Sequence, residues 1–459
     1  MSDHTTTEEA LLRRKAAATQ VAIAQGLLGE SDPVALMLDL DHVRGAIDSV
    51  RAAFDADSTT DFCHCLAIKS NPTLRVLQYV VQQGMGLEAA SLGELVQAIR
   101  AGAPAENIVF DSPVKTTEEI RFALKQGVTI NLDNMPELDR VAAIAAASGD
   151  AASRYRVGLR INPQGASGSL EAFSTGTMTS KFGIGLVDAR QEIIAAYKRY
   201  SWLNAIHIHV GSQGIPMDLM ASGVRRMLDL VKDIHAAVGK QQITLIDIGG
   251  GMSVNFSSEE ITPTFAELSE TLQQAAPELF SGEYRVFTEF GRSIVAKAGF
   301  YASRLEYVKT TGGRQIALQH IGADMAIRTI YHPDKWPLRV TLLTSEGALR
   351  PVESSEALVE TDIAGPCCFA GDIIAHRRPF PQLHSGEYIL VHDVGGYYHS
   401  SYSKYNLRQA PAVYGFTAAT PPVTLEVEHR STTYEEFQFT LLQARETVED
   451  TLRMFTPSD

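Results

Sequence analysis

Short runs of apolar, β-favouring residues alternate with amphipathic helical segments between about residues 60 and 300. The expected strands cover 62–68, 86–90, 107–110, 128–132, 155–161, 203–210, 243–249 and 284–290. Helices are expected between them, among others at 92–102, 116–127, 135–148 and 220–239. About eight such units in about 250 residues are typical of a (β/α)8 barrel, an α/β fold. A doubly wound sheet is the alternative, but no G-x-G-x-x-G follows the first strand.

After about residue 305 the pattern changes, because strand-like segments are now separated by turns instead of helices. These segments cover 313–321, 338–344, 357–366, 387–395 and 421–429. We therefore expect a helical extension over 1–32, a barrel over 33–305 and a mostly β domain over 306–459. Segment 32–54 reads as a strand and a helix, and this strand could belong to the β domain while its helix leads into the barrel.

The composition narrows the functional classes. A formal net charge of -14 argues against nucleic acid as the main partner, since binding of a phosphate backbone needs a basic face. Four cysteines in 459 residues do not form a disulfide framework, which favours a reducing compartment. The first 20 residues lack the apolar segment of a signal peptide, and no apolar run reaches the length of a membrane span. We expect a cytoplasmic protein with no membrane partner.

Several reactive side chains fall at the ends of the expected strands, where a barrel gathers its catalytic groups. Lys69 follows the first strand, and His207 and His209 share one face of the sixth. Ser212 comes next, and Gly249, Gly250 and Gly251 follow the seventh strand. Glu289, Gly291 and Arg292 end the eighth. Alone, each has an ordinary reading as a surface lysine, a core histidine or a loop glycine; their joint occurrence in this order points to a site.

The chemistry of these residues fits one cofactor. Three successive glycines expose backbone N–H groups to a phosphate, to which Ser212 and Arg292 could add a hydroxyl and a bidentate charge. The Lys69 amine could form a Schiff base with an aldehyde. Glu289 could pair with a pyridinium nitrogen, and His209 could stack on the ring. Together they predict pyridoxal 5'-phosphate.

A metal site is the competing interpretation of two histidine-containing motifs. In Cys63-His64-Cys65 the two thiols point to one face of a strand and the imidazole to the other, so core packing is the better reading. His207 and His209 share a face, but no third or fourth ligand is apparent in the sequence, and we predict no metal.

The motifs AIKSN, HVGSQ, DIGGG, EFGR, GPCCFAGD and GGYYHSSYSKYN, in this order, resemble those of the fold-type III pyridoxal-phosphate decarboxylases. This group includes the diaminopimelate, ornithine and arginine decarboxylases, and the layout is most similar to diaminopimelate decarboxylase. The resemblance covers about residues 33–415. It implies a cofactor-binding barrel, a β domain, and a head-to-tail homodimer in which the β domain reaches the partner's active site.

The resemblance also assigns roles by position. Lys69 would be the Schiff-base lysine, His209 would stack on the ring, and Glu289 would pair with its nitrogen. The phosphate would be held by Ser212, Gly249–Gly251, Arg292 and Tyr397, with Glu88 near the cofactor. In the pattern G-P-x-C-x-S-x-D the matching thiol is Cys368, the candidate proton donor, whereas Cys367 falls on a variable position. A cysteine in this motif favours decarboxylation over racemisation.

Three residues bear on the substrate, which is expected to be a small molecule, an amino acid. Arg328 and Tyr331 lie where diaminopimelate decarboxylases bind a distal carboxylate, with a spacing one residue shorter. The alternative is that they are a surface Arg and a packed Tyr.

Phe369 stands where decarboxylases of diamino acids often carry an acid that binds the distal ammonium. Phe offers only a weaker cation–π attraction. A carboxylated conjugate, such as a citrate–diaminopropionate siderophore precursor, is therefore an alternative substrate. An amino-acid racemase and an inactive regulatory homologue are further alternatives.

Overall fold

The computed structural model describes residues 2–56, 58–149, 154–165, 175–350, 356–418 and 437–456. The chain divides into two compact units. Residues 44–254 and 262–294 form one, the barrel unit, and residues 1–43, 255–261 and 295–459 form the other, the β unit. The segments 33–43 and 295–305 thus cluster with the β unit. No helix in the described part of the chain is long and apolar enough to cross a membrane.

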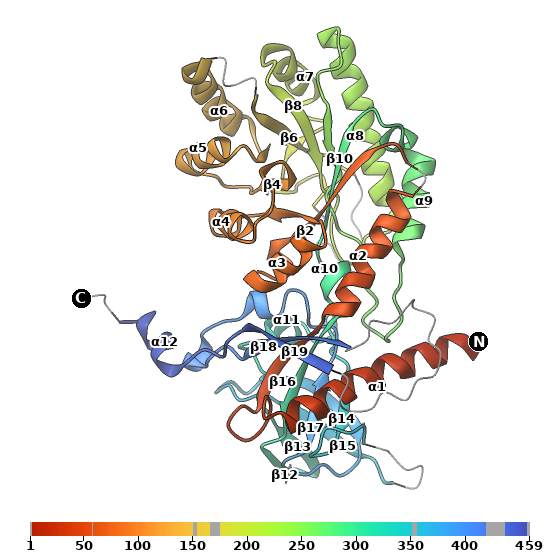
Figure 1. Cartoon of the computed structure of the whole chain (residues 1–459), viewed down its shortest axis with the longest axis vertical. Coiled ribbons are helices and arrows are strands. Elements are labelled where there is room, and N and C mark those ends of the chain that lie inside the picture. Colours follow the sequence, from red (N-terminus) through yellow and green to blue (C-terminus); the bar gives the residue numbers. More distant parts are fainter. Residues whose placement is uncertain are drawn as a thin grey trace. The chain divides into compact units, whose positions relative to one another are not determined.

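The barrel unit is a closed parallel barrel of eight strands, as expected from the sequence (Figure 1). The pairing order is β5-β4-β3-β2-β10-β9-β8-β6, and parallel pairing of β5 with β6 closes the ring, which rules out an open doubly wound sheet. The strands are β2 (Asp61–Ala67), β3 (Gly86–Ala89), β4 (Ile108–Asp111), β5 (Thr129–Leu132), β6 (Arg156–Asn162), β8 (Leu203–Ile208), β9 (Leu245–Asp247) and β10 (Arg285–Phe290). The short strand β7 (Ile184–Gly185) pairs with the end of β6.

Helices follow the barrel strands and start and stop at local signals in the sequence. Thr116 and Glu119 form a reciprocal capping box at the start of α5, and Gly127 ends this helix with a φ of 72°. Asn134 caps α6 through the N–H of Glu137. The helices are α2 (Leu40–Phe54), α3 (Leu74–Gln82), α4 (Leu92–Arg100), α5 (Thr117–Gln126), α6 (Met135–Ser148), α7 (Arg190–Arg199), α8 (Met217–Val238), α9 (Phe265–Ala275) and α10 (Arg292–Val295), with 3-10 turns η1 (Ile68–Ser70), η2 (Ala105–Asn107) and η5 (Pro277–Phe280).

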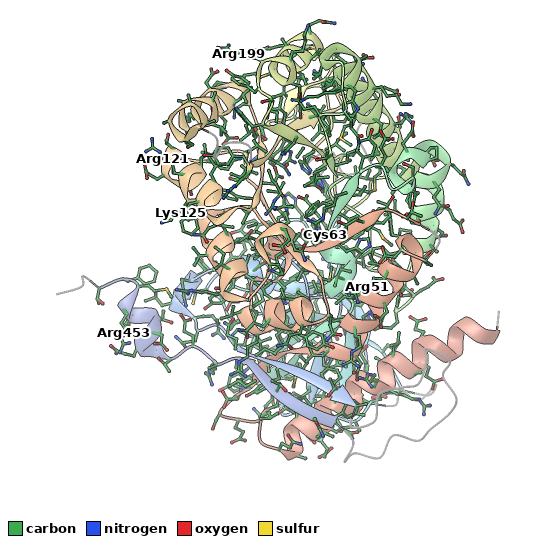
Figure 2. All side chains as sticks on the ribbon, turned by 45° about the horizontal axis from the view of Figure 1, so that its top comes forward. Arg51, Cys63, Arg121, Lys125, Arg199 and Arg453 are labelled. Carbon is green, nitrogen blue, oxygen red and sulfur yellow. The ribbon has the colours of Figure 1, made fainter. Side chains whose placement is uncertain are left out.

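In the barrel unit, exposed side chains lie on the outer helices and buried ones lie among the strands. Arg121, Lys125 and Arg199 are exposed on the outer helices, whereas Cys63 lies among the strands (Figure 2). Cys63 and Cys65 belong to an apolar cluster with Val109, Ala205, Leu245 and Phe287. His64 lies on the other face of β2 and contacts Thr288 and Asp55. The Cys63-His64-Cys65 motif is therefore used for packing and hydrogen bonding.

The described residues of the β unit form two sheets. The first has the order β14 (Val340–Leu343), β17 (Tyr388–Val391), β11 (Gly299–Arg304), β1 (Val34–Asp39), β18 (Ala412–Ala418) and β19 (Phe437–Gln443). The second has the order β12 (Tyr307–Thr311), β13 (Arg314–Leu318), β15 (Val359–Ala364) and β16 (Ile373–Phe380). Thus β1, from the N-terminal part of the chain, is an inner strand of the β unit. The expected strand 421–429 lies outside the described residues.

The N-terminal helix α1 (Ser2–Ala24) is an integral part of the β unit. Ala18, Val21 and Ala22 pack into one apolar core with residues of β1, β11, β17 and β18. Arg14 pairs with Asp39 at 2.5 Å and with Asp41 at 2.9 Å. The remaining helical segments of the unit are α11 (Ile327–Tyr331), α12 (Val448–Arg453), η6 (His399–Ser401) and η7 (Tyr405–Leu407).

Lys15 of α1 enters a buried ion cluster. Its Nζ lies 2.7 Å from Oε2 of Glu259, whose Oε1 lies 3.0 Å from both His392 Nδ1 and the Arg339 guanidinium. Glu259 belongs to the segment 255–261, which leaves the barrel unit after β9 and returns to it before α9. Helix α1 thus helps to hold this segment in the β unit.

Candidate functional site

Lys69 and Glu88 form an ion pair at the ends of two neighbouring barrel strands. Lys69 lies in η1 directly after β2, and Glu88 lies on β3. Lys69 Nζ is 2.7 Å from Oε2 of Glu88, whose side chain is fully buried, while the lysine side chain is 39% exposed. Burial raises the pKa of Glu88, and the ammonium of Lys69 offsets only part of that rise. The site therefore offers an accessible amine beside a buried carboxyl.

Glu289 lies near the end of β10 and is 3% exposed. Its Oε1 atom has no hydrogen-bond partner among the described residues. Burial raises the pKa of Glu289 well above its usual range, and the carboxylate of Asp247 raises it further. A buried acceptor without a donor costs free energy, so this carboxyl is suited to a ligand that carries an N–H group.

His207, fully buried on β8, lies between two carboxylates. Its Nδ1 is 3.0 Å from Asp247 Oδ2, and its Nε2 is 3.5 Å from Asp111 Oδ2. Burial opposes a charge on the ring, but Asp247, Glu289 and Asp111 outweigh it and raise the pKa of His207 well above its usual range. The surrounding carboxyl groups thus favour an imidazolium at this place in the barrel.

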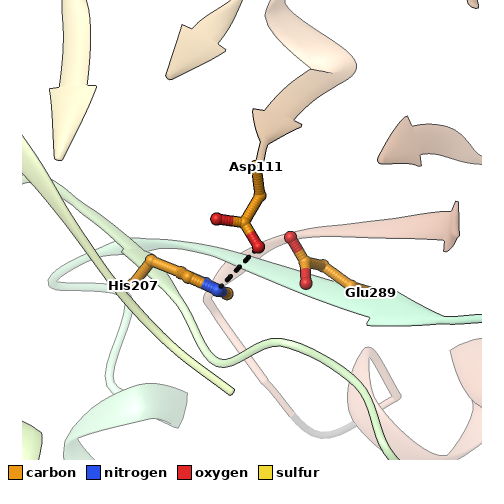
Figure 3. Close-up of side chains that lie close together, drawn as sticks. All are labelled: Asp111, His207 and Glu289. Atoms are coloured by element: carbon orange, nitrogen blue, oxygen red, sulfur yellow. Dashed lines mark ion pairs between the residues drawn. The ribbon is translucent and has the colours of Figure 1, made fainter. Parts of the chain in front are cut away.

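Asp111, His207 and Glu289 converge in the barrel interior (Figure 3). One potential ligand atom from each lies within 4.8 Å of the others, a spacing that a metal ion could use. Arg160, however, already pairs with the same oxygen of Asp111 that faces His207, and Asn131 Nδ2 donates to Asp247 at 2.9 Å. The cations Arg160 and His207 thus pair with the carboxylates of Asp111 and Asp247.

His209 follows β8 and differs from His207 in its charge. Its Nδ1 accepts a hydrogen bond from the N–H of Gly250 at 3.0 Å. Burial lowers the pKa of His209 well below its usual range, and the nearby charges of Arg160 and Lys69 lower it further. The ring is therefore neutral, with its proton on Nε2. The two histidines have separate partners and do not form a common ligand pair.

The glycine triad is packed too closely for any other residue. A Cβ on Gly250 would collide with the carbonyl oxygen of Glu289, and one on Gly251 with that of Gly211. Gly249 and Gly251 also have φ values of 68° and 103°. The triad therefore lies tightly between the end of β10 and the loop after β8.

The loops that carry Ser212 and the triad are tied together. The side chain of Gln213 bonds to both the carbonyl, at 2.7 Å, and the N–H, at 3.0 Å, of Val254. The hydroxyl of Ser253 accepts from the N–H of Gly214 at 3.0 Å. Ser212 is half-buried, and Arg292, at the start of α10, is 4% exposed.

In the β unit, Asp372 clamps the loop that carries Cys368. Its Oδ2 accepts from the N–H of Cys367 at 2.7 Å, and its Oδ1 accepts from the N–H of Ala323 at 2.6 Å. The N–H of Cys368 donates to Asn406 Oδ1 at 2.7 Å. Cys368 is exposed, whereas burial raises the pKa of Cys367 to about 12. Only one thiol of the pair is available for chemistry.

The expected substrate residues lie in the same unit. The rings of Tyr331 and Phe369 stack with centroids 5.8 Å apart, and both side chains are exposed. The guanidinium of Arg328 lies 4.8 Å from the ring centre of Tyr397 and 5.4 Å from that of Trp336. Arg328 and Tyr331 both come from the short helix α11.

The sequence-derived site residues therefore divide between the units. Lys69, Glu88, His209, Ser212, Gly249–Gly251, Glu289, Gly291 and Arg292 belong to the barrel unit, and Arg328, Tyr331, Cys368, Phe369 and Tyr397 to the β unit. The sequence reasoning missed Asp111, Asn131, Arg160 and Asp247. Asp111 and Asp247 are the last residues of β4 and β9, so acids at strand ends were the available signal.

Known proteins resemble this chain along most of its length. The family model described as "Pyridoxal-dependent decarboxylase, pyridoxal binding domain" matches residues 40–296. The diaminopimelate decarboxylase of Pseudomonas fluorescens is 32% identical over 349 residues, covering 75% of this chain and 79% of that protein. The diaminopimelate decarboxylase of Methanothermobacter thermautotrophicus is 29% identical over 354 residues, covering 75% of this chain and 78% of that protein.

Solved structures share the fold. Diaminopimelate decarboxylase from Helicobacter pylori, complexed with L-lysine, matches with a TM-score of 0.77 at 24% identity, covering 92% of this chain and 96% of that one. The enzyme from M. jannaschii, also with L-lysine, matches with a TM-score of 0.80 at 21% identity, covering 96% and 94%.

Proposed function

The chain belongs to the pyridoxal-dependent decarboxylases and is a carboxy-lyase of the diaminopimelate decarboxylase type, and we propose that its barrel unit binds pyridoxal 5'-phosphate through Lys69. The observation that carries this proposal is the accessible Lys69 amine paired with the buried Glu88 at the ends of β2 and β3. A positioned amine at the C-terminal end of a barrel strand is suited to covalent capture of an aldehyde.

The residues around Lys69 fit this cofactor. The unpartnered Oε1 of Glu289 would accept a hydrogen bond from the ring nitrogen. The neutral ring of His209, fixed by Gly250, would lie against the cofactor ring. Gly249–Gly251, Ser212 and Arg292 would bind the phosphate, Gly291 allows close packing on Ser70, and Tyr397 of the β unit would add a hydroxyl. When bound, the cofactor supplies an electron sink for the carbanion that loss of CO2 leaves.

Cys368 would supply the proton that replaces the departing CO2. The thiol is exposed, and its loop is fixed on both sides by Asp372 and Asn406. Because this thiol belongs to the β unit, we propose a homodimer in which the β unit of one copy completes the active site of the other. A cytoplasmic location fits a protein whose four cysteines are all free.

The substrate that we propose is an amino acid with a distal carboxylate, diaminopimelate being the first candidate because the relatives carry that name. Arg328 is the cation for this carboxylate. One observation favours a second candidate, a carboxylated conjugate without a distal ammonium. Phe369 stacks on Tyr331 and offers no anion to an ammonium group.

The test measures CO2 release from meso-diaminopimelate and from carboxylated diaminopropionate conjugates, together with the absorbance of the covalently bound cofactor. Lys69→Ala should abolish both signals, while Lys125→Ala, a change at an exposed lysine of α5, should leave them unchanged. Phe369→Glu should shift turnover toward diaminopimelate. A change of stereoisomer without CO2 release, measured by chiral chromatography, would indicate a racemase and contradict the proposal, as would an unchanged absorbance in Lys69→Ala.

A further inference from the structure

Six barrel strands contribute to one buried polar cluster. Asp111 (β4), Asn131 (β5), Arg160 (β6), His207 (β8) and Asp247 (β9) form a connected set of ion pairs and hydrogen bonds, which we call the barrel ion network. Glu289 of β10 lies beside this network, within 4.8 Å of Asp111 and His207 (Figure 3). All six side chains are nearly or fully buried.

The geometry favours a positive charge on His207. Both of its ring nitrogens face carboxylate oxygens, at 3.0 and 3.5 Å. An anion beside each nitrogen stabilises the ring with a proton on both. The raised pKa of His207 agrees with this arrangement. Asp111 and Asp247 thus favour a cationic ring at a defined place in the barrel.

Glu289 is surrounded mainly by other acids. The charged groups that act on it are Asp247, Glu88 and Asp111, which disfavour its ionised form, and His207, which favours it. Arg160 is directed to Asp111. Without His207, Glu289 would face three carboxyl groups in a buried environment.

We propose that His207 is a positioning residue that opposes the acids around Glu289 and favours its ionised form once the ring nitrogen of the cofactor lies against it, and that it acts only through Glu289. This inference rests on the proposed function, since it needs the cofactor ring to meet Glu289. A neutral side chain in place of His207 would favour the protonated form of Glu289 further, and a protonated acid cannot form an ion pair with a pyridinium nitrogen.

The experiment compares two ligands, pyridoxal phosphate and its analogue with carbon in place of the ring nitrogen. Their dissociation constants are measured by fluorescence for the wild type, His207→Gln, Glu289→Gln and the double variant. His207→Gln should weaken the binding of pyridoxal phosphate by about tenfold, which corresponds to one pKa unit. The same change should weaken the binding of the analogue by less than about twofold. In the Glu289→Gln background, His207→Gln should have no further effect.

Controls separate this role from a structural one. His64→Gln changes another buried histidine of the barrel unit, which bonds to Thr288 and Asp55, and should not discriminate between the ligands. His207→Lys, which retains a cation, should restore most of the preference for the nitrogen-containing ring. If His207→Gln does not fold, the ratio of the dissociation constants of the two ligands is measured for His207→Asn instead. Equal weakening of both ligands, or a full effect in the Glu289→Gln background, overturns the inference. Failure of the wild type to bind pyridoxal phosphate overturns the proposed function instead.

Discussion

Lys69 Nζ lies 2.7 Å from Oε2 of Glu88, and this contact places a buried negative charge against the amine that would capture the cofactor. A carboxylate at this distance favours the ammonium over the neutral amine. Only the neutral amine attacks an aldehyde. The pair therefore stabilises Lys69 in its unreactive form until a ligand changes the local charge.

The first prediction concerns this pair. Glu88→Gln keeps the shape but removes the charge that favours the ammonium, so the reaction of Lys69 with pyridoxal phosphate at pH 7 should accelerate by roughly three- to tenfold. Stopped-flow absorbance measures the rate. The same gain should vanish at a pH high enough to deprotonate Lys69 in both proteins, and a slower reaction at pH 7 would contradict the expectation.

The second prediction concerns the four thiols. Cys63, Cys65 and Cys367 are buried, and only Cys368 is exposed. Because alkylation needs an accessible thiolate, iodoacetamide at pH 8 should modify one thiol per folded chain. Mass spectrometry of the digested protein should locate it at Cys368, and Cys368→Ser should remove the modification. Labelling of Cys367 in the native protein would show that the loop is not held as described.

The third prediction concerns Asp372, whose carboxylate accepts from the N–H groups of Cys367 and Ala323. Asp372→Ala leaves two buried donors without acceptors and should lower the free energy of unfolding by roughly 2–4 kcal/mol, as judged by urea denaturation. Decarboxylation should fall more strongly than cofactor affinity, because Cys368 loses its position. Asp334→Ala, at an exposed acid of the same unit, is the matched control.

The fourth prediction concerns the anchor of α1. Lys15→Met removes one partner of a buried ion pair and should cost roughly 3 kcal/mol in the free energy of unfolding. Arg13→Ala, a change two residues from Lys15, breaks the exposed i,i+4 pair with Glu9 and should cost no more than about 0.5 kcal/mol. Chemical denaturation distinguishes the two. Equal stability of both variants would mean that α1 is held by its apolar face alone.

The fifth prediction is a pH dependence. Burial would raise the pKa of Glu259, but His392 and Lys15 outweigh it and lower the pKa well below its usual range. The contribution to stability is therefore fully present above the unfolded-state pKa of about 4.3 and is lost as the pH falls below it. The stability difference between wild type and Glu259→Gln should be largest near pH 7 and shrink toward pH 3. A difference that stays constant over this range contradicts the assignment.

Most of the barrel was predictable because its signals are local. Each parallel strand is buried on both faces and appears as an apolar run, and the helix caps at Thr116 and Asn134 are visible in the sequence. The strands β8 and β9 are shorter than expected, because Gly249 and Gly251 turn the chain and His209 bonds to the triad loop. The place of β1 between β11 and β18 was left open, since pairing across more than 250 residues leaves no local pattern.

The candidate site could be predicted where several reactive residue types occur together, in order, at the ends of the strands. Lys69 and Gly249–Gly251 each have an ordinary reading alone, and they could be named only because they occur together with the other strand-end residues. The barrel ion network could not, because the meeting of Asp111 with His207 depends on the closure and register of the barrel. In the sequence, Asp, Asn and His residues within a strand look like ordinary buried polar residues as long as their partners across the barrel are not known.

The excursion of residues 255–261 out of the barrel unit limits how this chain could be recombined. A barrel cut out as one continuous piece from residue 44 to residue 294 would still contain Glu259, but without Lys15, Arg339 and His392. Glu259 would then lack these three partners for its carboxylate. A chimera that exchanges the β unit must therefore transplant residues 1–43, residues 255–261 and the residues from 295 onward as one set.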